Sequence, residues 1–143
     1  MSPKKKYSGH WYKLEGKEAD PALAQVLIIP APYEGSVSYG HGAARGPLAL
    51  FDASQLVEHL EPELGNRPCR IGIAGLPELQ IQKLKPQAAV AKVEQAVRAV
   101  LKKGKKPVLL GGEHSISSGA IKACAEMHPR PDRAPPRRPF RSA

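Results

Sequence analysis

Three short, continuous apolar runs constrain the fold of this chain more than any other feature. They are QVLIIP at residues 25–30, RIGIAGL at 70–76 and PVLLGG at 107–112. Strands that are apolar throughout, rather than in alternation, are typical of parallel sheets buried on both faces. The runs alternate with helical patterns, so the sequence predicts an α/β fold with a parallel sheet and helices on both faces.

The segments between and after the apolar runs carry the helical patterns. One helix is predicted to begin at Pro47 and to place Leu56 and Leu60 on its apolar side. A second, strongly amphipathic helix is predicted from Pro86, because apolar residues follow it at i, i+3, i+4 and i+7. A third is predicted over residues 115–128.

The chain of 143 residues is long enough for one domain. We assign the folded part to residues 23–128. Three strands make a small sheet, because sheets average five or six strands, and the fold is therefore expected to be the first three strands of a larger one. Residues 1–22 are polar without a sustained period and are expected to form an extended arm. Residues 129–143, rich in Pro and Arg, are expected to be a disordered tail.

The net charge of +9 suggests, at face value, a nucleic acid or another polyanion as partner. The excess lies at the two ends of the chain, however. Residues 4–6 are lysines, and the last sixteen residues hold five arginines against one aspartate. A non-catalytic, basic binding protein is therefore the alternative interpretation, supported by charge alone and by no recognised nucleic-acid-binding module.

Cysteine usage and hydropathy indicate a cytoplasmic protein that is not bound to a membrane. Cys69 and Cys124 lack the spacing of a zinc site and are expected to be buried or half-buried thiols in a reducing compartment. No signal-peptide pattern follows the lysines near the start, and no apolar run approaches the length that spans a bilayer.

The third apolar run ends in GGEHS, where Glu113 and His114 follow two glycines. In parallel sheets, ligands bind at the carboxyl ends of the strands. An imidazole there can bind a metal, and a neighbouring carboxylate can bind the metal or orient the imidazole. By spacing alone, a plain strand-to-helix turn with an exposed histidine is the favoured interpretation. A phosphate-binding loop is disfavoured because the glycine motifs of such loops are absent.

The first apolar run is followed by a long Gly-rich loop over residues 31–46. A loop of this kind at the ligand edge often shapes a pocket, although it can equally be a mobile surface loop. His41 lies in it, but its spacing gives no reason to pair it with His114. His10 and His59 are expected at the surface, the latter on the polar side of its helix.

Two motifs resemble those of the ureohydrolases, the agmatinase and arginase family. IPAPYEGSVSYGHGAARGPLALFDAS resembles the family's opening motif, and LLGGEHSIS is similar to its first metal motif, usually written G-G-D-H-S. The Ser-Tyr element is more similar to agmatinases than to arginases, and Glu113 stands where Asp is commoner. The resemblance covers residues 25–127.

The resemblance implies an α/β/α fold around a parallel sheet and a pair of manganese ions that activate water for attack on a guanidinium carbon. It further implies a small guanidino substrate such as agmatine, urea as a product, a role in polyamine biosynthesis and a homo-oligomer. His114 matches a ligand to one manganese. The two later metal motifs of the family, D-A-H-x-D and D-x-D-x-x-D, do not occur in this sequence.

The basic tail stands where the pattern calls for a further apolar strand. Pro, Arg, Ala and Phe codons read one nucleotide later from Arg130 permit an apolar strand, and those of residues 137–141 then permit Asp-Ala-His-Ser-Asp. We therefore interpret the tail as the product of a single-nucleotide frameshift in the gene or in its sequencing; a genuine disordered basic arm is the alternative. Because the 143-residue chain contains only one of the family's metal ligands, it is expected to be catalytically inactive.

Overall fold

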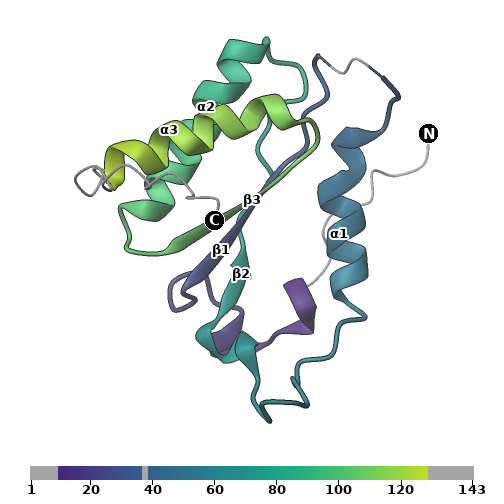
Figure 1. The fold of residues 1–143 in the computed structure, drawn as a ribbon, viewed down its shortest axis with the longest axis vertical. Coiled ribbons are helices and arrows are strands. Elements are labelled where there is room, and N and C mark those ends of the chain that lie inside the picture. The colour runs from purple at the N-terminus through teal and green to yellow at the C-terminus, as the bar shows by residue number, and fades with distance from the viewer. Residues whose placement is uncertain (1–9, 37–38, 129–143) are drawn as a thin grey trace, which may run out of the picture.

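The computed structural model describes residues 10–36 and 39–128 and shows a three-stranded parallel sheet (Figure 1). The strands are β1 (Val26–Ala31), β2 (Ile73–Gly75) and β3 (Lys106–Gly111), and β1 lies in the middle, in the order β2-β1-β3. Each strand falls on one of the three apolar runs, and both pairings are parallel. The predicted α/β fold is confirmed.

β2 is shorter than the apolar run that predicted it. Pro68–Ile71 forms a 3-10 helix, and Gly72 follows with a φ of 79°. A Cβ at Gly72 would lie 2.7 Å from the Cα of Ala24, so only glycine allows the chain to turn this close to the segment that precedes β1. The strand begins at Ile73, once this turn is complete.

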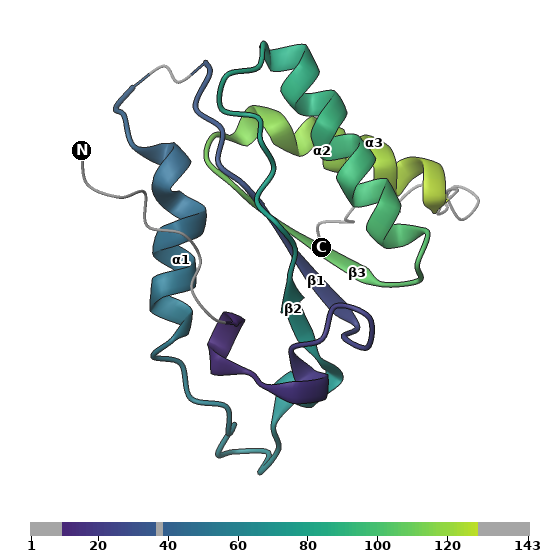
Figure 2. The ribbon, with the colours of Figure 1, turned by 180° about the vertical axis from the view of Figure 1, so that it is seen from behind.

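Helices cover both faces of the sheet: α1 (Gly46–Ser54), α2 (Pro86–Leu101) and α3 (Ser117–Met127). Figures 1 and 2 show α2 and α3 on one face and α1 on the other. Successive side chains of a strand point to opposite faces. Leu27 and Ile29 accordingly belong to the main apolar cluster with α2 and α3, whereas Ile28 packs with Phe51 of α1.

α2 is the amphipathic helix that the sequence predicts from Pro86. Its fully buried side chains recur at helical spacing: Ala89, Val93, Val97 and Val100. Proline suits the first turn because no N–H is needed there. Gly104, with a φ of 69°, ends the segment in the left-handed conformation common after helices.

The residues that precede β1 pack against the fold from residue 11 onward. Trp11 is only 4% exposed, and its ring meets that of Phe51 edge-on with centroids 5.1 Å apart. Leu14 and Ala19 are buried as well. The expectation of an extended arm over residues 1–22 is therefore wrong for its described part. Isolated apolar residues give no periodic signal, although the side chains of this segment are buried against the fold.

α1 is also shorter than predicted, because it ends at Ser54. Leu56 and Leu60 lie beyond the helix and are 83% and 57% exposed. His59 is half-buried in the following loop, where its Nε2 donates to the carbonyl oxygen of Tyr12 at 2.5 Å. The prediction of a surface histidine on the polar side of a helix is wrong, because His59 tethers two segments.

The remaining expectations concern thiols, membranes and the tail. Cys69 is buried and Cys124 half-buried, and both are free thiols, as predicted. Within the described residues, no helix has both the length and the apolarity that a membrane span requires. The predicted disordered tail, residues 129–143, lies outside the described residues.

Candidate metal site

The carboxyl ends of β1 and β3 lie side by side. Ala31 pairs with Gly111 in register, and one step further the N–H of Glu113 donates to the carbonyl oxygen of Tyr33 at 3.0 Å. The Gly-rich loop after β1 and the GGEHS turn after β3 therefore leave the same edge of the sheet. Parallel α/β sheets bind their ligands at this edge.

Gly112 allows the two loops to touch. A Cβ on this residue would overlap the carbonyl oxygen of Tyr33 and would lie 3.0 Å from backbone atoms of Ala43 and Ala44. These neighbours are backbone atoms, which cannot rotate away as a flexible side chain can. The glycine is therefore required by the close approach of the loops.

Gly112→Ala is expected to lower the free energy of unfolding by about 1–3 kcal/mol, the usual cost of overpacking. Gly46→Ala is the matched control, because its Cβ would lie at an ordinary 3.4 Å from the carbonyl oxygen of Gly111 and should change stability by no more than about 0.5 kcal/mol. Guanidinium chloride unfolding followed by circular dichroism measures both. Equal stability of the two variants would contradict the close approach.

Glu113 is buried, and its carboxylate joins the two loops. Its Oε2 accepts the N–H of Ser36 at 2.8 Å, and its Oε1 accepts the hydroxyl of Ser36 at 2.6 Å and that of Ser115. Burial by itself raises the pKa of the Glu113 carboxyl. Hydrogen bonds from Ser115, from Ser36 and from the N–H of Gly35 outweigh burial and leave this pKa below its ordinary value. Glu113 is thus an ionised acceptor whose oxygens are already engaged.

Glu34 plays a similar part within the Gly-rich loop, where it joins the start of the loop to its end. Its carboxylate accepts the N–H groups of Gly42, at 2.9 and 3.0 Å, and of Ala44, at 3.0 Å, and its Oε1 lies 3.1 Å from Nδ1 of His41. The bonds from Ala44 and Gly42, followed by the effect of His41, hold the pKa of Glu34 below its ordinary value despite the opposing effect of burial. His41 therefore pairs with Glu34.

His114 is exposed at this edge and, unlike His41, pairs with no carboxylate of the described residues. It begins a 3-10 turn, His114–Ile116, that leads directly into α3. Among the described residues, no hydrogen bond holds its imidazole, which is free to bind a cation. The same residues contain no cluster of three or more His, Cys, Asp or Glu side chains that could hold a metal. The edge therefore offers one imidazole and two carboxylates that are engaged elsewhere, and this set fits one ligand of a metal centre but not a complete centre.

The sequence motifs locate His114 and Glu113 but give no indication of the partners of the carboxylates. Ser36 lies 77 residues from Glu113, and no pattern in the chain connects the two. The alternation of strands and glycines predicts that their loops share an edge. The bond itself depends on side-chain directions that the sequence does not reveal.

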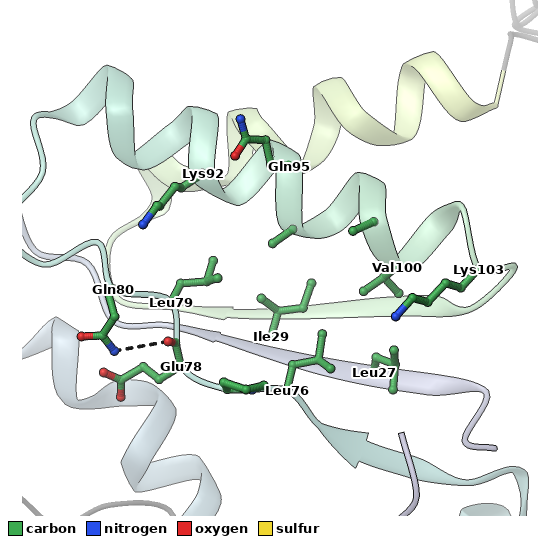
Figure 3. A pocket seen from close by; sticks show the side chains of 13 residues that line it. Leu27, Ile29, Leu76, Glu78, Leu79, Gln80, Lys92, Gln95, Val100 and Lys103 are labelled. Atoms are coloured by element: carbon green, nitrogen blue, oxygen red, sulfur yellow. Dashed lines mark hydrogen bonds between the residues drawn. The ribbon is translucent and has the colours of Figure 1, made fainter. Parts of the chain in front are cut away.

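An apolar groove of about 500 Å³ lies between the sheet and α2 (Figure 3). Leu27 and Ile29 of β1 form its floor, and the segment after β2 and one side of α2 form its walls. Lys92 and Lys103 stand at its rim. The lining includes neither His114 nor any other histidine, so the groove does not extend the candidate metal site.

Comparison with known proteins gives one family and several relatives. The family model of the arginase family matches residues 24–134. The N(1)-aminopropylagmatine ureohydrolase of Synechocystis is 35% identical over 128 residues, which cover 85% of this chain and 42% of that protein. An agmatinase of Bacillus subtilis is 29% identical over 123 residues, which cover 86% of this chain and 42% of that protein. The chain thus spans about two-fifths of the length of these relatives.

A solved structure agrees with the sequence comparison. The formiminoglutamase of Trypanosoma cruzi, crystallised with Mn²⁺, superimposes with a TM-score of 0.66 at 27% identity. The match covers 77% of this chain and 39% of that protein. The described sheet and helices therefore have the arrangement of the corresponding part of that enzyme.

Proposed function

Because the chain belongs to the arginase family, we propose that it forms the first part of a manganese-dependent ureohydrolase that releases urea from a small guanidino compound. The observation that carries the proposal is the place of His114. Its exposed imidazole stands at the carboxyl edge of a parallel sheet, in a turn held by the buried carboxylate of Glu113.

The proposed substrate is agmatine or an aminopropyl derivative of it. The support is the substrate named for the Synechocystis relative and the agmatinase activity named for the Bacillus relative. Both substrates carry a guanidinium group on an amine-bearing chain, so hydrolysis yields urea and a polyamine. We further propose that the protein works in the cytosol, whose reducing conditions suit its two free thiols, and that it assembles as a homo-oligomer.

Manganese is the proposed cofactor, and His114 is the residue of this chain that would hold it. A bound manganese lowers the pKa of water and orients it for attack. The divalent ion needs several nitrogen and oxygen ligands, and the described residues supply one. The ureohydrolase activity is therefore proposed for the longer protein, whereas the 143-residue chain is proposed to be inactive.

The purified 143-residue chain is expected to release no measurable urea from agmatine, with or without added Mn²⁺. The same gene read in the neighbouring frame from codon 130 onward is expected to yield an active enzyme. The gene is first resequenced across codons 128–143. Colorimetric urea determination then compares urea release by the two proteins. Robust manganese-dependent release by the 143-residue chain would refute the proposal that it lacks essential ligands. Steep, salt-dependent binding to duplex DNA would favour the basic binding protein instead.

A further inference from the structure

The carboxylate of Glu113 is buried without a cation beside it. The residue is 9% exposed, and within the described part of the chain its partners are neutral donors from Gly35, Ser36 and Ser115. An unpaired charge is costly to bury, and it persists only where several hydrogen bonds compensate for lost water. Glu113 therefore combines two properties: a dense set of hydrogen bonds and an uncompensated negative charge next to His114.

The donors come from two loops that meet at this edge. Gly35 and Ser36 follow β1, whereas Ser115 follows His114 on the turn after β3. One carboxylate oxygen accepts a hydroxyl from each loop, so Glu113 is the side chain that bridges them. Hydrogen bonds to an ionised acceptor are roughly twice as strong as neutral ones.

We propose that Glu113 is a positioning residue, which latches the Gly35–Ser36 segment to the turn that carries His114 and supplies a negative charge that favours a cation on that imidazole. This role rests on the proposed function, because it assigns Glu113 to the metal site. Both of its oxygens already accept hydrogen bonds from Ser36 or Ser115, and we assign Glu113 to supporting His114 rather than to binding the metal itself. This latch would hold the loop after β1 and the turn after β3 in a fixed position relative to each other.

The latch is tested by amide hydrogen exchange of the 143-residue chain, followed by NMR. Glu113→Ala is expected to speed exchange at Gly35 and Ser36 by about tenfold or more, since a hydrogen bond to a charged group contributes at least that factor. Glu58→Ala removes an exposed carboxylate and should leave these amides unchanged. If Glu113→Ala does not fold, Ser36→Ala removes one donor from an exposed loop and should speed exchange at Gly35 by about threefold. Unchanged exchange in the folded variant would overturn the latch.

The charge is tested separately with Glu113→Gln, which keeps the length of the side chain. Added Mn²⁺ broadens the ring signals of the histidine that it approaches. We expect Glu113→Gln to require at least about three times as much Mn²⁺ for equal broadening at His114, because a nearby negative charge attracts the cation. The broadening at His41 is the internal reference and should not change. Equal broadening at His114 in both proteins would overturn the electrostatic role. Neither measurement depends on urea release, so failure of the latch and failure of the proposed function are distinguishable.

Discussion

Trp11→Ala is expected to lower the free energy of unfolding by about 3–5 kcal/mol, the typical cost of removing a large buried aromatic side chain. Such a loss is a large share of the roughly 5–15 kcal/mol that stabilises a native domain. The indole packs edge-on against Phe51, belongs to the same apolar cluster as Ile28 and covers Gly75, where a Cβ would lie 2.5 Å from its Nε1. Its removal would leave a cavity between the sheet and α1.

The measurement is guanidinium chloride unfolding followed by circular dichroism. Fluorescence is unsuitable, because Trp11 is the only tryptophan of the chain and the variant would lose the probe. Tyr39→Ala is the matched control: it removes an aromatic ring that is 99% exposed and should change stability by no more than about 0.5 kcal/mol. Equal stability of the two variants would mean that the segment around Trp11 is an arm after all.

The apolar runs predict the sheet well because burial on both faces leaves a strong and local signal. The pattern from Pro86 predicts α2 for the same reason, since the side chains that it buries recur every three to four residues. The end of α1 is not predictable in this way. Leu56 and Leu60 continue the helical spacing, but the helix ends at Ser54. The hydroxyl of Ser54 donates to the carbonyl oxygen of Phe51 and accepts the N–H of Tyr12.

Tertiary contacts also explain why the sequence does not predict the packing of the first segment. A single indole among polar residues has no period, and its contribution depends on a space between α1 and the sheet that exists only in the folded chain. The candidate site is likewise predicted by the sequence only in part. Glycines at the end of β3 predict the turn and the place of His114. The bonds from Ser36 and Ser115 to Glu113 depend on two loops meeting, which local sequence does not encode.

His114→Ala is expected to have the largest effect on activity, in the enzyme that we propose results from reading the gene in the neighbouring frame. Residues that only support metal ligands typically cost 10–100-fold in metal affinity or activity when they are replaced. Direct loss of a ligand should therefore lower kcat for urea release by more than about 100-fold. His41→Ala is the matched control, because His41 lies at the same edge but is 91% exposed and pairs with Glu34.

The manganese content of that enzyme, measured by atomic emission after removal of free metal, shows directly whether His114 binds manganese. The resemblance to ureohydrolases implies two ions per chain. We expect the parent enzyme and His41→Ala to retain both, and His114→Ala to lose at least one at equal Mn²⁺ concentration. Full retention of both ions by His114→Ala would contradict the proposal that His114 is a manganese ligand of a ureohydrolase site.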